Sequence, residues 1–141
     1  MSYRFWLILS LCLMALAVVS ARPLAKIIIP DVLTTAMRHY AGVDSINCGV
    51  VPIGWSFEAA NRCVDAAYQA KQAFTVRYNL QGIDSQFSEG LASNECGEIH
   101  GYGYDKYVMD ENPTDEHVSE QHCRTIRIIL DVYGKRRGCE P

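Results

Sequence analysis

The stretch from Ser56 to Ile83 constrains the fold most, because two different hydrophobic periods follow one another in it. In its first part, small and apolar side chains recur every three or four residues, which is typical of one face of an α-helix. From Phe74 to Leu80 the period changes to two, which is typical of a strand with one buried face. The helical stripe comprises Phe57, Ala60, Val64, Ala67 and Lys71, with Cys63 and Ala70 beside it. This order predicts an α+β domain, in which one main helix packs on an antiparallel sheet.

Residues 1–21 have the three parts of a secretory signal peptide. Arg4 supplies a basic start, residues 5–19 form an uncharged apolar run, and the small residues at 19–21 suit signal peptidase. A run of about 15 apolar residues is shorter than the roughly 20 that span a bilayer. We therefore predict cleavage before Arg22, an extracellular or periplasmic location, and no membrane association afterwards. An uncleaved anchor and a lipoprotein modified at Cys12 are the alternatives.

The predicted mature chain has a length that suits one domain with a modest core. We divide it into an N-terminal arm with a short helix, 22–42, and a single disulfide-stabilised α+β domain, 43–141. The full chain has a formal charge of −3, and loss of Arg4 makes the remainder more acidic. Because nucleic-acid phosphates call for clustered Lys and Arg, we expect no nucleic-acid partner.

The cysteines that follow the predicted signal peptide indicate disulfides, as is usual in exported chains. We expect bridges Cys48–Cys63 and Cys123–Cys139, because each closes a loop of about 15 residues and would stabilise the fold by roughly 3 kcal/mol. Other pairings of the same thiols remain open. Cys96 is then left in a run of turn residues, either as a free surface thiol or as the link of a disulfide-bonded dimer.

The rest of the chain predicts a short helix and further strands. We expect a helix over 31–42, capped by Asp31 and stopped by Gly42, and then a loop over 43–55. A bend at 82–85 would return the chain into strands over 86–92 and 98–108, separated by a turn. Residues 109–121 show no clean period and predict a surface loop. The last predicted strand, 124–133, would bury its apolar side, which comprises Ile126, Ile128, Leu130 and Val132. The sheet would then have about four strands.

Short motifs are distributed over most of the predicted mature domain. They are Cys48-Gly49, Cys63, Phe74, Gly82-Ile83-Asp84-Ser85, Tyr104-Asp105, Cys123 and Cys139. Their order resembles that of small exported bacterial proteins of unknown function. The resemblance implies a fold and a compartment, and no activity comes with it.

A helix followed by antiparallel strands is also similar to the order in cystatins, the secreted inhibitors of cysteine proteases. The inhibitory hairpin of cystatins carries Gln-x-Val-x-Gly, whereas the equivalent bend here is Asn79-Leu80-Gln81-Gly82. The resemblance therefore allows a cystatin-like fold and does not support cystatin activity.

Aromatic side chains alternate with glycines in the predicted strand 98–108. His100, Tyr102 and Tyr104 would share one face, with Tyr107 nearby, while glycines 101 and 103 leave the opposite face bare. Tyrosine has an apolar ring and a polar tip, which suits recognition surfaces. These four residues are our candidate ligand- or partner-binding face; the alternative is that the rings form core beneath a helix.

Three patterns suggest catalysis or metal binding, and each has a simpler interpretation. Residues 116–123 include His117 and His122, whose five-residue spacing does not match one helical face. Cys96 and His100 would need hydrogen-bond contact and a third group to act as a nucleophilic pair. Ser85 lacks the Gly-x-Ser-x-Gly elbow. We therefore predict no catalytic residue, metal or cofactor.

Charge is unevenly distributed in the second half of the chain. Residues 84–120 contain ten acidic side chains and one basic one, Lys106, whereas 124–137 contain five basic and one acidic. An acidic surface could dock on a basic partner, or the two charged segments could simply keep the domain soluble.

Gly134 before three basic residues also resembles the signal for an amidated peptide cut at Lys135. A basic turn next to the last disulfide is the alternative.

These observations favour a secreted binding or inhibitor-like module that acts without catalysis on an unidentified protein or small-molecule ligand. The alternatives are a secreted hydrolase or metal-binding enzyme that uses the His117/His122 region, and a precursor of an amidated peptide.

Overall fold

The structure, a computed structural model, describes residues 31–82, 85–107 and 118–141, without the side chains of residues 85–86 and 106–107. These residues form two helices and seven strands. In chain order they are α2 (Val32–Ala41), β1 (Ile46–Val51), α3 (Glu58–Gln69), β2 (Phe74–Gln81), β3 (Ser85–Ser93), β4 (Ile99–Tyr107), β5 (Val118–Cys123), β6 (Thr125–Asp131) and β7 (Gly134–Glu140). The predicted signal peptide and the arm before residue 31 lie outside the described residues.

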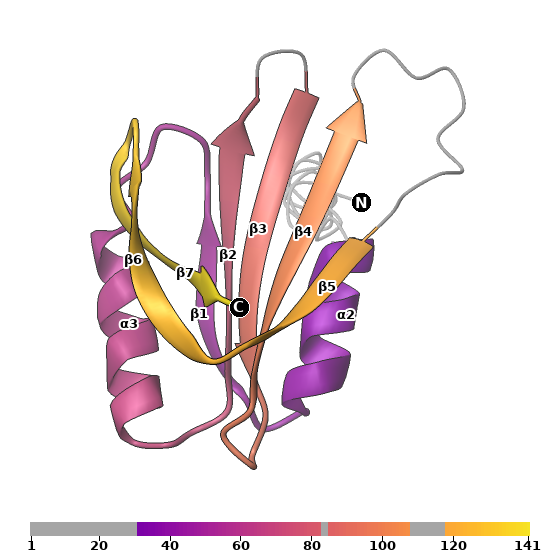
Figure 1. The fold of residues 1–141 in the computed structure, drawn as a ribbon, viewed down its shortest axis with the longest axis vertical. Helices are drawn as coiled ribbons and strands as arrows, with labels where there is room; N and C mark the ends of the chain where they lie inside the picture. Colours follow the sequence, from indigo (N-terminus) through magenta and orange to yellow (C-terminus); the bar gives the residue numbers. More distant parts are fainter. Residues whose placement is uncertain (1–30, 83–84, 108–117) are drawn as a thin grey trace, which may run out of the picture.

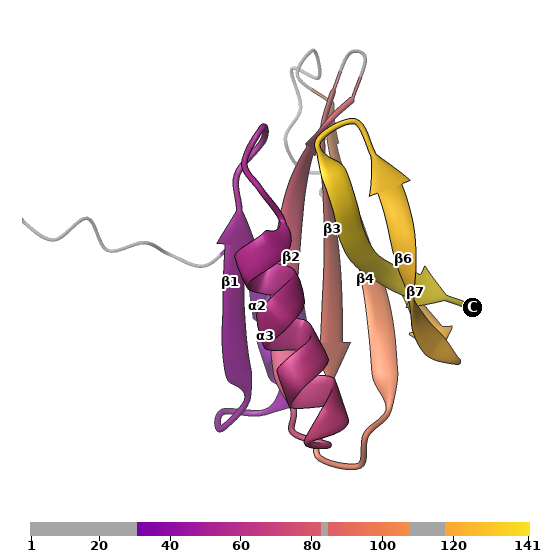
Figure 2. The ribbon, with the colours of Figure 1, turned by 90° about the vertical axis from the view of Figure 1, so that its left-hand side faces the viewer.

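Five of the strands form one mixed sheet in the order β1-β2-β3-β4-β5, and β6 pairs with β7 in a separate hairpin. Strands β1 and β2 run parallel, and all other neighbours are antiparallel. Helices α3 and α2 lie on opposite sides of the sheet (Figure 1). The hairpin stands on the same side as α3 (Figure 2). The α+β class is thus confirmed, but the fold is dominated by its sheet and is not one helix on four antiparallel strands.

The predicted loop over 43–55 contains β1, and this prediction was wrong. The strand pairs parallel to β2, so α3 connects two parallel neighbours in a βαβ unit. Its sequence, INCGVV, shows no alternation because the register shifts between Asn47 and Val50. Gly49 lies within this irregularity at φ +95°, a conformation that L side chains rarely adopt.

The C-terminal third also differs from the prediction. Residues 118–121 are part of β5, not of a surface loop, and residues 108–117 lie outside the described residues. Strand β6 exists, but it does not bury its apolar face: Leu130 is 78% exposed and Val132 is 90% exposed. The reason is strand β7, in a segment whose basic sequence predicts only a turn. Strand β7 packs against the sheet, in the position that the sequence predicts for β6.

The larger core lies between α3 and the sheet. Helix α3 buries Ala60, Val64 and Ala67, as its periodicity predicts. These small side chains let the helix approach Phe74 and Tyr78 of β2, both fully buried. Burial of each such large side chain contributes about 1.5–3 kcal/mol, so this contact is the main stabilising layer.

A second core lies between α2 and the other face of the sheet. Leu33, Met37 and Ala41 of α2 pack on Ala92 of β3 and on two β4 tyrosines, Tyr102 and Tyr104. The helix starts as predicted, because the Asp31 carboxylate accepts a hydrogen bond from Thr34 N at 2.9 Å. Burial raises the pKa of Asp31, but hydrogen bonds from Arg77 and Thr34 outweigh this and lower it overall. The Arg77 ion pair also ties the helix start to β2.

Two disulfides join elements that are distant in sequence, and both expected pairings are confirmed. Cys48–Cys63 links β1 to α3, and Cys123–Cys139 links the end of β5 to β7. Cys96 is free and exposed. Two disulfides in a small domain fit an oxidising compartment such as the periplasm or the cell exterior. Within the described ranges, no helix has the length and apolar character needed to cross a bilayer.

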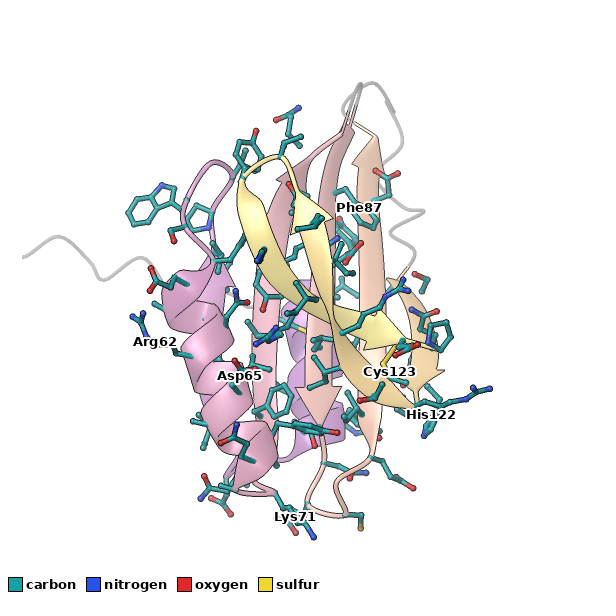
Figure 3. The ribbon with its side chains drawn as sticks, turned by 60° about the vertical axis from the view of Figure 1, so that its left-hand side comes forward. Arg62, Asp65, Lys71, Phe87, His122 and Cys123 are labelled. Carbon is teal, nitrogen blue, oxygen red and sulfur yellow. A yellow bond between two sulfur atoms is a disulfide. The ribbon has the colours of Figure 1, made fainter. Side chains whose placement is uncertain are left out.

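The hairpin is held against α3 as well as by its disulfide. Asn61 of α3 donates to the carbonyl oxygen of Lys135 at 2.7 Å and accepts from Arg137 N at 3.2 Å. The Arg137 guanidinium forms two hydrogen bonds with the Asp65 carboxylate. Asp65 lies on the hairpin side of α3, whereas Arg62 points outward (Figure 3). Residues 134–137, the proposed peptide-precursor signal, are thus part of a paired strand; cleavage at Lys135 stays a prediction.

The bare face of β4 gives a test of how the hairpin meets the sheet. A Cβ at Gly101 would lie 2.7 Å from Cys139 Cβ, an atom fixed by the disulfide. A Cβ at Gly103 would meet only the hydroxyl of exposed Ser119 at such short range, and a hydroxyl can rotate away. We expect Gly101→Ala to lower the free energy of unfolding by about 1–3 kcal/mol and Gly103→Ala to lower it by much less. Urea denaturation of the oxidised domain measures both values, and equal losses would contradict this packing.

Candidate functional site

The candidate binding residues of β4 face α2. Tyr102 and Tyr104 are buried in the second core, while His100 is partly exposed at its edge. The side chain of Tyr107 lies outside the described residues. The two buried tyrosines thus pack beneath α2, and a role of this face in binding stays a prediction.

A groove of about 540 Å³ opens between α2 and the β4–β5 edge of the sheet. We call it the α2 groove; it is lined by Val32, Thr35, Ala36, His39, Tyr40, Tyr102 and Glu120. One face of α2 forms a wall of the groove, because its lining residues are spaced by three or four positions: 32, 35, 36, 39 and 40. Tyr102 of β4 and Glu120 of β5 line the groove from the sheet.

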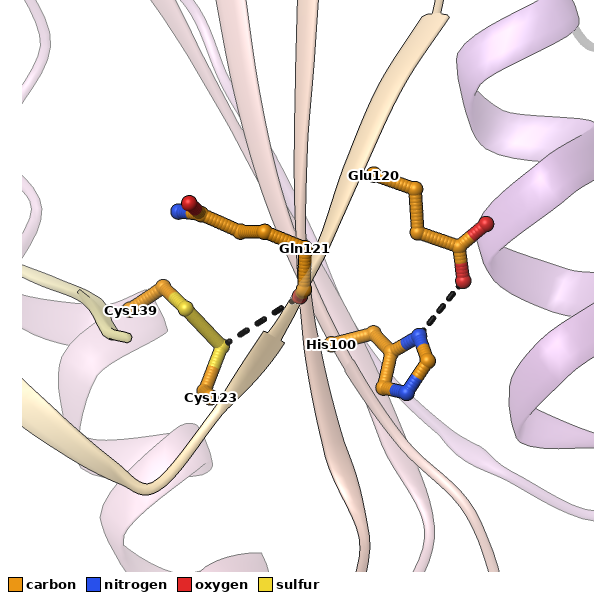
Figure 4. Close-up of a disulfide and its surroundings, with 5 residues drawn as sticks. All are labelled: His100, Glu120, Gln121, Cys123 and Cys139. Atoms are coloured by element: carbon orange, nitrogen blue, oxygen red, sulfur yellow. Dashed lines mark hydrogen bonds and ion pairs between the residues drawn. A yellow bond between two sulfur atoms is a disulfide. The ribbon is translucent and has the colours of Figure 1, made fainter.

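A polar group of the groove is the Glu120 carboxylate, of which one oxygen is engaged by described residues. Glu120 Oε1 lies 2.5 Å from His100 Nδ1 and accepts a hydrogen bond from the Tyr102 hydroxyl at 3.1 Å. The other oxygen, Oε2, points toward α2 (Figure 4). It has no hydrogen-bond partner among residues 31–82, 85–107 and 118–141. A carboxylate in this state can accept a donor from a ligand.

Aromatic rings hold the histidine in place. Tyr40 stacks on His100 with ring centroids 4.1 Å apart, and its edge faces Tyr102 at 6.4 Å. His122 lies opposite His100 in the β4–β5 register and meets its ring at 5.5 Å. The Tyr40 hydroxyl accepts a hydrogen bond from Asn94 at 3.3 Å. Helix α2 and the sheet thus fix this end of the groove together.

The tyrosines of the groove keep their protons. Burial raises the pKa of Tyr102, and the hydrogen bond to Glu120 and the charge of that carboxylate raise it further. Burial also raises the pKa of Tyr40, and the charges of Glu98 and Glu120 add to the effect. Both hydroxyls therefore remain donors near neutral pH and do not serve as bases.

The described residues of the other chemical patterns in the sequence do not come together in a site. His122 is exposed on β5, and His117 lies outside the described residues. No group of three or more His, Cys, Asp and Glu side chains that could hold a metal occurs in the described part of the chain. Cys96 hydrogen-bonds through its backbone N–H to Asn94, and no hydrogen bond joins it to His100 among the described residues. The Ser85 side chain is not described.

A smaller cavity of about 280 Å³ lies on the opposite face of the sheet, beneath the β6–β7 hairpin. Its floor includes Gly101 and Gly103, the bare face that the sequence predicts. Two basic side chains line it: Arg137 pairs with Asp65 on α3, whereas Arg127 forms no ion pair among the described residues. Next to the cavity, Arg136 pairs with Glu89 and Asp131. The cavity is thus framed by ion pairs that hold the hairpin, and we assign it a structural role.

Comparison of the chain with protein-family models, curated proteins and solved structures finds no match. Any function must therefore be argued from the geometry of the chain itself.

Sequence reasoning missed the α2 half of the groove and its carboxylate. Tyr40 and His39 end the predicted helix over 31–42, but no local pattern indicates that this helix crosses β4. Glu120 lies in residues 109–121, which show no clean period and predict a surface loop. Its position becomes informative only after β5 pairs with β4, which places Glu120 directly opposite Tyr102.

The raised pKa values predict loss of stability in alkali. Burial raises the pKa of Tyr78 to about 12, and that of Tyr102 is also raised. The unfolded chain releases tyrosine protons near pH 10, so the free energy of unfolding should fall as pH rises from about 10 to 12. Tyr102→Phe should make that fall shallower, whereas Tyr68→Phe at an exposed position of α3 should not. Urea unfolding of Cys96→Ser protein across this range is the measurement; identical slopes for both variants would refute the assignment.

Proposed function

We propose that the predicted mature chain is a small exported binding module that acts without catalysis, and that its α2 groove takes a basic side chain of a protein partner. One observation carries the proposal: a largely apolar groove is lined by a carboxylate, one oxygen of which has no hydrogen-bond partner among the described residues. For the first alternative, a hydrolase or metal-binding enzyme, the described ranges contain no group of three or more His, Cys, Asp and Glu side chains that could hold a metal.

The chemistry of the groove matches the two parts of a Lys or Arg side chain. Such a side chain has an apolar stem and a cationic head. The stem would lie along Val32 and Ala36, and the head would reach Glu120 Oε2. The Tyr40 ring at the same end adds an attractive face for a cation. A charge-assisted hydrogen bond to a carboxylate is about twice as strong as a neutral one, so Glu120 would provide much of the selectivity.

The charge of the sequence from residue 84 to residue 120 favours the same class of partner. Residues 84–120 contain ten acidic side chains and one basic one. An acidic surface attracts a basic partner over several ångströms and speeds its association at low salt. The partner would thus be a protein with an exposed basic segment, which fits an inhibitor-like role.

Export is part of the proposal and has its own test. The disulfides fit an oxidising compartment, and residues 1–21 have the composition of a signal peptide. Expression of the full chain in a secreting host should release a product that starts at Arg22 and has two disulfides and one free thiol. Intact-mass analysis of the medium measures this. A product that keeps residues 1–21, or one that ends before Lys135, would contradict the proposal.

Binding can be tested with defined peptides before any partner is known. The test compares pools of extended hexapeptides that have a central Arg or Lys with matched pools that have norleucine at that position. Chemical-shift changes of the α2 and β5 amides measure affinity. We expect the basic pools to bind and Glu120→Gln to weaken them about tenfold or more, as expected for loss of a hydrogen bond to a charged group. Glu58→Gln, an equivalent change on the exposed face of α3, is the matched control.

The rim of the groove provides a test of charge sign. Val32 is 46% exposed at the start of α2, so a charged side chain fits there. Val32→Lys should weaken binding of the basic pools, and Val32→Glu should strengthen it. Equal binding of basic and norleucine pools, or no effect of Glu120→Gln, would refute the groove assignment. Cleavage of the recovered peptides would refute action without catalysis.

A further inference from the structure

Strand β6 has one free edge. Strand β7 pairs with one side of it, and β7 is the strand that lies against α3, β3, β4 and β5. Figure 2 shows the hairpin standing away from the sheet, with β7 on the inner side. The outer edge of β6 pairs with no strand of the described chain. Alternate residues of β6 therefore turn unpaired backbone N–H and C=O groups outward.

The exposed face of β6 and its turn is apolar. Ile128, Leu130 and Val132 lie at every second position and are 55, 78 and 90% exposed. Free strand edges in soluble proteins are usually short or protected by charges, since a long apolar edge pairs readily with another strand. An edge of this kind is typical of a covered interface.

The sequence of β6 is complementary to itself in one antiparallel register. A twofold axis through Ile129 places Arg127 opposite Asp131 of a second copy, and Ile128 opposite Leu130 of that copy. Arg127 forms no ion pair within the described residues. Asp131 accepts hydrogen bonds from Arg136 Nε at 3.4 Å and from Tyr133 N at 3.3 Å, so the Arg127 of a second copy would share a carboxylate that is already bonded. The dimer would thus gain two charge pairs on one face and apolar pairs on the other.

The neighbouring registers lack this match. A shift of one residue places Arg127 opposite an apolar residue and leaves its charge without a partner, which is unfavourable. The charge pattern therefore selects both the orientation and the register of pairing.

We propose that two copies of this domain associate by antiparallel pairing of their β6 strands about Ile129, which joins the two hairpins into one four-stranded sheet. The α2 groove lies on the other face of the five-stranded sheet, so both grooves stay open in the dimer. The interface is small, and we expect a dissociation constant of the order of 10–100 µM. This inference does not depend on the proposed ligand of the groove.

A cysteine trap tests the register. In the Cys96→Ser background, Ile129→Cys would lie opposite its own copy, with Cβ atoms about 4.5–5.5 Å apart, close enough for a disulfide. Val132→Cys is the matched control, because it is far more exposed but lies opposite Ile126 of the second copy. Non-reducing electrophoresis after mild oxidation should show at least fivefold more dimer for Ile129→Cys. Equal or greater cross-linking of Val132→Cys would overturn the register, because it indicates random collision.

Sedimentation equilibrium of the oxidised Cys96→Ser domain tests the association itself. We expect a concentration-dependent dimer that weakens at least tenfold in Arg127→Glu and does not change in Arg38→Glu, a control on the exposed side of α2. A melting curve for each variant confirms that it is folded. A domain that stays monomeric at 1 mM would overturn the proposal. Pairing of β6 with a strand of another protein instead would overturn it as well. A dimer that forms only when Cys96 is present would overturn it in favour of the disulfide-linked dimer.

Discussion

The alternation of aromatic and glycine residues along β4 decides what each face of the sheet accepts. His100, Tyr102 and Tyr104 provide a tall aromatic surface on one side, on which α2 packs. Gly101 and Gly103 provide a flat surface on the other side. There Cys139 lies so close to Gly101 that a Cβ at that position would be 2.7 Å from Cys139 Cβ. A side chain at Gly101 would push Cys139 away, and with it the hairpin and the second disulfide.

The Cys123–Cys139 disulfide is one of the contacts that hold the inner strand of the hairpin. The bond ties β7 to the end of β5, and Asn61 and Asp65 of α3 bind β7 as well, so β7 lies against the sheet and β6 lies outside it. The exposed apolar face of β6 accompanies this arrangement. On the other face, the same sheet edge meets α2, and Glu120 at that edge gives the α2 groove a carboxylate oxygen without a hydrogen-bond partner in the described part of the chain. The two candidate binding surfaces thus arise from one strand and one disulfide.

Local patterns predicted the features that depend on local physics. The periodicity of residues 57–67 identified the buried face of α3, Asp31 identified the start of α2, and loop lengths identified both disulfides. Features that depend on long-range pairing were missed. Strand β1 is irregular around Gly49 and becomes a strand only because β2 pairs with it. Strand β6 has the alternation of a core strand, yet its burial depends on β7, whose basic sequence resembles a turn. Of the face predicted on β4, only Tyr102 lines the α2 groove, and the α2 wall of the groove requires the tertiary fold.

One measurement tests the central claim, that α2 and the hairpin cover opposite faces of β4. Nuclear Overhauser contacts of the oxidised domain report proton pairs closer than about 5 Å. The structure predicts contacts from the Gly101 α-protons to the Cys139 β-protons, and from the Tyr102 ring to side chains of α2. Contacts from Gly101 to α2, or from the Tyr102 ring to β7, would show that the faces are assigned wrongly and would contradict the account.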